Sequence, residues 1–201
     1  MLLSDKARRR VRRTVLVLMT AVAVIAAAGW AERERDADEE YLVYSAYLSD
    51  GLLNDAHDWS VGGPVLVVVK DKTTAGENLR FQALYVLDGR INFEGLRAST
   101  RVSYLVRNLF HTRIQPKFVL PSRAKVALTS QSNYGASEFQ KKFPRNLGFV
   151  VLSGVGFNPS RTQAVFYIDH FCGLCGGGRY VFMEKVDGTW RVRDEHYTWI
   201  S

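Results

Sequence analysis

The residues whose types and spacing best suit chemistry form one short stretch, His170-Phe-Cys172-Gly-Leu-Cys175. Two cysteines separated by two residues can close a disulfide, act as a redox dithiol or supply half of a zinc site. A redox dithiol needs a helix N-terminus, whose dipole lowers the thiol pKa, whereas strand-like residues flank this motif. Because the N-terminal sequence predicts export to an oxidising compartment, we expect a disulfide between Cys172 and Cys175 at the tip of a hairpin.

A zinc site at the same motif is the metal-binding alternative. A structural zinc ion takes four protein ligands, and only His170, Cys172 and Cys175 are local. The residues that would have to fold across to complete the site are His196, Asp169 and Glu195. We expect no bound cofactor, and His170, Cys172, Cys175 and His196 are the candidate ligands of this alternative.

Three tyrosines, Tyr41, Tyr44 and Tyr47, form a stripe within a segment of helical periodicity, residues 38–54. A stripe of rings at this spacing is typical of a helix face that packs against a sheet. The functional alternative is a ligand-binding groove lined by the three rings and suited to a sugar or a peptide.

The best-known catalytic and nucleotide-binding motifs are absent from the sequence. It holds no Gly-x-Ser-x-Gly, no P-loop and no His-Glu-x-x-His. His111 lies near the end of a helix predicted over residues 100–112, where a favourable interaction with the helix dipole explains it. We therefore assign no catalytic residue and favour a non-enzymatic protein.

The first 31 residues predict a membrane segment. Residues 1–13 form a basic cytoplasmic flank with six Lys and Arg residues, and residues 14–31 carry no charge. Apolar residues surround this run on all sides, as in a membrane helix. Its 18 residues fit a single-pass transmembrane anchor, which we favour, or a signal peptide with a small-x-small cleavage pattern at Gly29 and Ala31 or at residues 26–28. Either way, the chain beyond residue 31 lies outside the cytoplasm.

Composition and charge restrict the class of protein further. The hydrophobic fraction of 47% and the charged fraction of 23% are typical of a globular chain. Much of the formal charge of +7 lies in the basic flank, and residues 32–40 form an acidic linker. The basic residues of the region 41–201 are scattered along the sequence. Because a nucleic-acid binder clusters its basic residues on the folded domain, we expect no nucleic-acid partner.

Residues 41–201 predict one extracytoplasmic α+β domain. Helical periodicity marks residues 38–54, 100–112 and 137–143, and short extended pieces lie at 65–69 and 124–129. Four further strand-like stretches occupy residues 149–152, 162–168, 179–184 and 189–193. Asp187-Gly188, between the last two, is a strong hairpin signal. We expect helices packed on an antiparallel sheet that ends in a C-terminal β-meander.

Short motifs throughout this domain carry a family resemblance. They are Tyr41-Leu-Val-Tyr-Ser-Ala46, Leu152-Ser-Gly-Val-Gly-Phe-Asn158, Gln163-Ala-Val-Phe-Tyr167, Gly176-Gly-Gly-Arg-Tyr180, Glu184-Lys185, Gly188-Thr-Trp190 and Trp199-Ile-Ser201. With these motifs the chain resembles a group of bacterial exported, membrane-anchored proteins of no known activity. The resemblance implies an extracytoplasmic α+β domain and lends the chain no catalytic residue.

These observations predict a binding or envelope-associated module held at the cytoplasmic membrane through residues 14–31. Its expected partner is an envelope protein, a peptide or a glycan. A secreted or periplasmic domain released by signal cleavage is the alternative location. An exported enzyme, or a thiol or metal protein that uses His170, Cys172 and Cys175, is the alternative function.

Overall fold

The computed structural model describes residues 36–53, 64–74, 93–172 and 176–201. The chain forms two compact units, residues 1–39 and 40–201. Of the first unit, only residues 36–39 are described, and they are helical. The predicted basic flank, the predicted span over residues 14–31 and most of the acidic linker lie outside the described residues. Among the residues that are described, no helix combines the length and the apolar character needed to cross a membrane.

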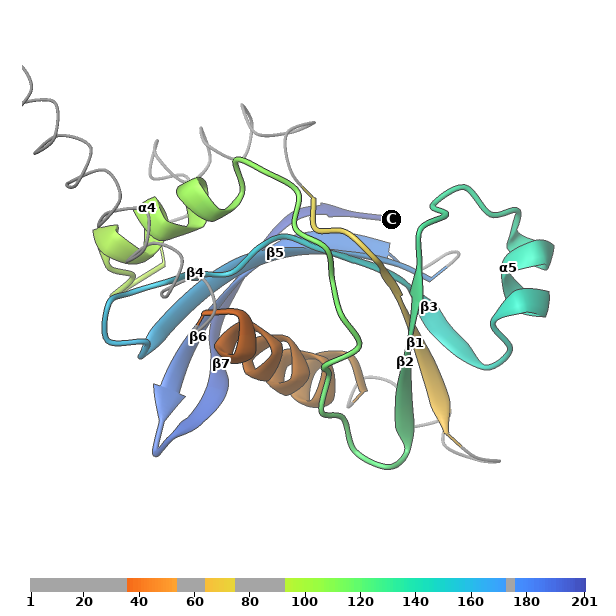
Figure 1. Cartoon of the computed structure of the whole chain (residues 1–201), viewed down its shortest axis with the longest axis horizontal. Coiled ribbons are helices and arrows are strands. Elements are labelled where there is room, and N and C mark those ends of the chain that lie inside the picture. The colour runs from red at the N-terminus through yellow and green to blue at the C-terminus, as the bar shows by residue number, and fades with distance from the viewer. Residues whose placement is uncertain (1–35, 54–63, 75–92, 173–175) are drawn as a thin grey trace, which may run out of the picture. The chain divides into compact units, whose positions relative to one another are not determined.

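The second unit contains one mixed sheet of seven strands (Figure 1). The strands are β1 (Val65–Lys70), β2 (Ala124–Thr129), β3 (Asn146–Leu152), β4 (Gly156–Phe157), β5 (Gln163–Phe171), β6 (Gly176–Val186) and β7 (Thr189–Ile200). Their order across the sheet is β2-β1-β3-β5-β6-β7, and β4 pairs with β5. A mixed sheet accompanied by a few helices is consistent with the predicted α+β class.

The prediction of a wholly antiparallel sheet is wrong in one half, because β1 pairs in parallel with both β2 and β3. Parallel neighbours need a long crossover connection, which is usually helical. Residues 130–145, between β2 and β3, make such a crossover and contain the helix α5, Ala136–Lys142. The continuous apolar run of β1 is typical of a strand buried on both faces, as parallel strands usually are, but this signal alone does not determine the direction of its neighbours.

The other half of the sheet is antiparallel, with β5, β6 and β7 paired in sequence order. The four strand-like stretches predicted in the last third of the chain are confirmed as parts of β3, β5, β6 and β7. Asp187 and Gly188 connect β6 to β7 with φ angles of 50° and 78°. Two successive positive φ values are the mark of the type I′ hairpin turn, which the Asp-Gly pair predicts.

Helices flank both faces of this sheet. Residues 36–47 are α-helical and continue into a π-helical segment, Leu48–Leu52, close to the predicted range of 38–54. The helix α4 covers Ala98–Arg107 and ends five residues before the predicted boundary. His111 therefore lies beyond the helix, and its Nδ1 is 2.7 Å from the carbonyl oxygen of Thr73. The interpretation of His111 through the helix dipole is corrected accordingly.

Alternate residues of the strands face the two helices. Phe166 of β5 belongs to the largest cluster of buried residues, together with Tyr44 of the first helix. Tyr167, the next residue of β5, belongs to a second cluster together with Tyr104 of α4. We call the part of the first helix that belongs to the second unit helix 40–53. Figure 1 shows the sheet curving around this helix, with α4 across the sheet from it. Two helices thus pack on opposite faces of the same strands.

Candidate functional site

The histidine of the cysteine motif is held by the backbone of a neighbouring strand. His170 lies near the end of β5, and its Nε2 is 2.6 Å from the carbonyl oxygen of Leu147. Burial lowers the pKa of His170 below its ordinary value of 6.5, although the contact with the Leu147 carbonyl partly opposes this shift. Cys172 has no free thiol. Cys175 lies outside the described residues, so the disulfide stays a prediction.

The structure does not bring the two candidate histidine ligands together. His170 of β5 lies opposite Gly177 of β6, whereas His196 of β7 lies opposite Tyr180 of β6. The two histidines are therefore on different strands and three positions apart along the sheet. In the described part of the chain, no three His, Cys, Asp or Glu residues are placed to share a metal ion.

Glu195, one of the residues considered as a fourth zinc ligand, is held in an ion pair. Its Oε1 is 3.3 Å from Nε of Arg179 and accepts a hydrogen bond of 2.8 Å from the hydroxyl of Tyr47. Arg179 also lies over the ring of Tyr197, with its guanidinium carbon 5.1 Å from the ring centre. The positive charge of Arg179 neutralises the negative charge of Glu195, as in a structural ion pair.

Asp169, the other candidate, accepts two hydrogen bonds from aromatic side chains. The hydroxyl of Tyr167 and the indole N–H of Trp199 both donate to its Oδ1, at 2.7 and 2.8 Å. Burial raises the pKa of Asp169 above its ordinary value of 3.8, and these two bonds lower it by less. Burial likewise raises the pKa of Tyr167, to about 12. A carboxylate of raised pKa is a possible proton acceptor, but here both donors bind it from within the fold.

This cluster was missed by sequence reasoning because its members come from different strands. Gly178 of β6 lies beneath all three side chains, and a Cβ at that position would collide with Tyr167, Asp169 and Trp199. The run Gly176-Gly-Gly178 was the available signal. A run of glycines is typical of a turn, whereas these glycines begin β6 and one of them leaves room for the aromatic cluster.

The tyrosine stripe of the first helix packs inside the domain. The relative exposures of Tyr41, Tyr44 and Tyr47 are 8%, 1% and 0%. The rings of Tyr44 and Tyr47 meet the ring of Phe166 edge-on, at centroid distances of 5.6 and 5.3 Å. No ring face of these three residues is left at the surface, so they do not line an open ligand groove.

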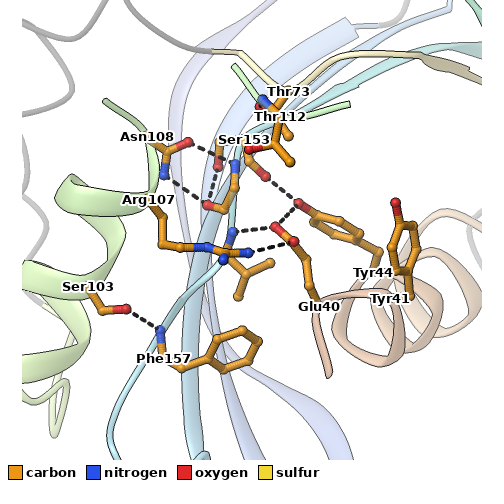
Figure 2. Close-up of polar contacts among 12 residues, drawn as sticks. Glu40, Tyr41, Tyr44, Thr73, Ser103, Arg107, Asn108, Thr112, Ser153 and Phe157 are labelled. Atoms are coloured by element: carbon orange, nitrogen blue, oxygen red, sulfur yellow. Dashed lines mark hydrogen bonds and ion pairs between the residues drawn. The ribbon is translucent and has the colours of Figure 1, made fainter. Parts of the chain in front are cut away.

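The helix α4 turns its polar residues toward the sheet (Figure 2). The side chains of Thr100, Tyr104 and Asn108, one helical turn apart, are 0–1% exposed. Arg107 forms an ion pair of 2.8 Å with Glu40, in which the two side chains are 16% and 8% exposed. Ser103 accepts a hydrogen bond of 3.0 Å from the backbone N–H of Phe157. The inner face of α4 is therefore built from hydrogen-bonding groups.

These polar residues hydrogen-bond to the backbone of residues 153–157, which comprises the connection after β3 and the short strand β4. Oδ1 of Asn108 accepts a hydrogen bond of 2.8 Å from the N–H of Gly154, and Nδ2 of Asn108 donates one of 2.9 Å to the Gly154 carbonyl. Glu40 accepts the N–H of Val155 at 2.9 Å. A buried backbone group without a partner is costly, so this break between strands requires polar side chains from the helices.

The outer side of α4 is apolar as a consequence. Val102 and Val106 of α4 have relative exposures of 56% and 60%, and Leu109 and Phe110, in the turn after its end, have 50% and 73%. We call these four residues the α4 surface. The sequence pattern does place Val102, Leu105, Val106 and Leu109 on one face of a helix. That face points away from the sheet, except that Leu105 packs partly against the second core cluster. An apolar stripe of this kind usually packs on the core, whereas most of this one faces solvent.

A basic stretch surrounds the α4 surface in the sequence. Residues 95–137 contain seven Lys and Arg residues and no Asp or Glu. Arg97 and Arg113, which precede and follow the α4 surface, are exposed. The seven basic residues are spread over 43 positions and form no dense run, so it is the absence of Asp and Glu that distinguishes this stretch.

Comparisons of the chain with family models, with curated proteins and with solved structures find no significant match to any of them.

Proposed function

We propose that the chain is a non-enzymatic binding module, held outside the cytoplasm by an anchor over residues 14–31. The basic flank, the uncharged run and the resemblance to exported bacterial proteins support the anchored location. Its partner belongs to the cell envelope, and the α4 surface is the binding surface.

The observation that carries this proposal is the inverted orientation of α4. Apolar side chains normally face the core of a domain, because burying them stabilises the fold. Here the polar side of α4 is occupied by the backbone of residues 153–157, and Val106 and Phe110 are left in solvent. Contiguous exposed apolar residues of this kind mark interaction sites. The stability of the domain itself gains little from them.

Four ionisable groups among the described residues support binding rather than catalysis. Glu40, Asp169 and Glu195 each accept hydrogen bonds from within the fold, and His170 is held by the Leu147 carbonyl. Such groups stabilise the structure without requiring a substrate. The domain therefore recognises its partner through the surface of α4 and not through a reactive centre.

The anchored location is tested by protease treatment of spheroplasts that produce the full chain with a C-terminal epitope tag. We expect the tag to be digested, because residues 41–201 lie outside the membrane. The control variant carries Leu16→Arg and Leu18→Arg in the span, and its tag stays protected. Protection of the tag in the unmodified chain contradicts the proposal, and release of residues 32–201 in soluble form establishes the cleaved alternative.

The thiol or metal alternative is tested by the native mass of the same chain, before and after reduction and alkylation. We expect the cysteines to react only after reduction, with no metal adduct, because Cys172 and Cys175 form a disulfide. A stoichiometric zinc ion, or thiols that react at once, would instead assign an active site to His170 and the two cysteines.

A further inference from the structure

We infer that the α4 surface docks on the anionic phospholipid surface of the membrane that carries the anchor. This inference rests on the proposed function, and it names the partner of the binding surface. Four observations lead to it: the exposed apolar residues, the surrounding positive charge, the short distance along the chain to the predicted span, and the self-repulsion of two such surfaces.

The α4 surface has the composition of a helix that lies in a membrane interface. Val102 and Val106 are one helical turn apart on α4, and Leu109 and Phe110 follow in the turn directly after the helix ends at Arg107. Helices of this kind bury an apolar face at the boundary between headgroups and acyl chains. The inner face of α4 already has its hydrogen-bond partners in the fold, so docking requires no rearrangement.

Charge favours an anionic partner. The stretch of residues 95–137 is free of Asp and Glu, and exposed arginines flank the α4 surface at Arg97 and Arg113. Lys and Arg residues near a membrane surface are attracted to anionic headgroups within about a Debye length. Apolar insertion and this attraction are two separate signals, and stable association with a membrane generally needs two.

The chain itself limits the distance between α4 and the membrane. The predicted span ends at Ala31, and Glu40 follows nine residues later. Glu40 is bound to Arg107 of α4 at 2.8 Å. Nine residues reach about 30 Å when fully extended and about 14 Å when helical. A tether of this length keeps the α4 surface at a high effective concentration near the headgroups, so even weak docking is populated.

A second copy of the chain is a poorer occupant of the same surface. Two α4 surfaces placed face to face would bring two acid-free, arginine-bearing stretches together, and like charges across an interface oppose association. An anionic lipid surface satisfies both the apolar and the basic residues.

The test uses the full chain reconstituted into vesicles whose lipids carry brominated acyl chains, which quench tryptophan on contact. The variant Phe110→Trp places a reporter in the α4 surface, and Val186→Trp, at the β6–β7 hairpin, is the matched control because Val186 is also exposed. We expect quenching of the tryptophan added at position 110 in vesicles of phosphatidylcholine with phosphatidylglycerol. We expect much weaker quenching in phosphatidylcholine alone, and none of the tryptophan added at position 186.

Quenching of the native Trp30 distinguishes failure of the docking inference from failure of the membrane anchor. Trp30 lies at the end of the predicted span, so the quenching that is lost on Trp30→Phe reports on the anchor alone. Quenching of Trp30 without quenching at position 110 overturns the docking inference and leaves the anchor intact. Absence of both overturns the proposed function.

Two further outcomes also overturn the inference. Equal quenching at position 110 in both lipid mixtures contradicts the role of the basic stretch. An emission shift at position 110 in detergent that grows with protein concentration assigns the α4 surface to a second copy. In support, the double variant Arg97→Gln with Arg113→Gln is expected to lose most of the quenching that depends on anionic lipid while Trp30 stays quenched.

Discussion

Helix 40–53 and α4 pack on opposite faces of the same strands but use their amphipathic character in opposite ways. The first buries its aromatic stripe and exposes Leu42, which is 49% accessible. The second buries Thr100, Tyr104 and Asn108 and exposes Val102 and Val106. The difference lies in what each helix meets. Helix 40–53 meets apolar side chains of the sheet. The helix α4 meets such side chains through Tyr104, but it also meets a stretch of backbone whose N–H and C=O groups take helix side chains as partners.

An amphipathic pattern therefore identifies a helix but not which side of it is buried. The buried side is decided by the groups opposite, and at residues 153–157 these are main-chain amides and carbonyls. Leaving such groups without partners costs more than leaving a few valines in solvent. The apolar side of α4 is thereby left available for another surface.

The largest effect is expected from removing the acid that joins the two helices. Glu40→Ala leaves Arg107 without its carboxylate and the N–H of Val155 without an acceptor. Breaking a buried ion pair from one side costs about 3–5 kcal/mol of unfolding free energy. Denaturant unfolding of the full chain in detergent micelles measures this loss of unfolding free energy. Glu94→Ala, at an exposed position, is the control and should change little; equal losses in both variants would contradict a role specific to Glu40.

A somewhat smaller loss is expected where α4 touches β4. A Cβ at Gly156 would collide with the backbone of Tyr104, which has no freedom to move. Gly156→Ala should therefore cost about 1–3 kcal/mol of unfolding free energy, as overpacking does. Gly135→Ala is the matched control, because nothing lies within 4 Å of a Cβ there. If Gly156→Ala unfolds at the same denaturant concentration as the control, α4 does not pack on β4 as described.

Asp169 and His170 are neighbours on β5, and strand alternation directs their side chains to opposite faces of the sheet. The pH dependence of the unfolding free energy therefore compares the two faces. Burial raises the pKa of Asp169, so the folded state binds more protons than the unfolded state just above pH 3.8. The free energy of unfolding should fall as pH rises through that window. Asp169→Asn should flatten this dependence in a series of denaturant titrations. An unchanged slope would place Asp169 in solvent.

For His170 the sign is reversed. Burial lowers its pKa, so below pH 6.5 the unfolded state binds more protons than the folded state. The free energy of unfolding should fall as pH decreases through this range. His170→Gln keeps a donor for the Leu147 carbonyl and should weaken the dependence on pH. A variant that is as acid-sensitive as the unmodified chain would show that other groups cause the effect.

Local patterns were sufficient for the elements whose own residues determine them. The β-branched run at 65–69 forms β1, and Asp187-Gly188 forms the predicted hairpin turn. The tyrosine stripe predicted a helix packed on the sheet, and that helix is present. In each case the residues that produce the signal are close in sequence and make the contact themselves.

The remaining features depend on residues that are far apart in the chain. The parallel pairing of β1 with β2 is determined by long connections, and the Asp169 cluster unites β5 with β7. Asn108 and Gly154, 46 residues apart, determine the orientation of α4. The pattern of residues 98–110 does not predict that the polar side is buried, because the backbone groups that need these side chains belong to residues 153–157.

The inverted orientation of α4 is tested most directly by one pair of isosteric substitutions. Val43 in the first helix is 0% exposed, and Val106 in α4 is 60% exposed. Val43→Thr and Val106→Thr make the same change in helix propensity, so their difference in unfolding free energy reports on burial. We predict a loss of about 1–3 kcal/mol for Val43→Thr, which buries a hydroxyl, and a change within about 0.5 kcal/mol for Val106→Thr. Equal losses would mean that the apolar side of α4 is buried, which contradicts the account.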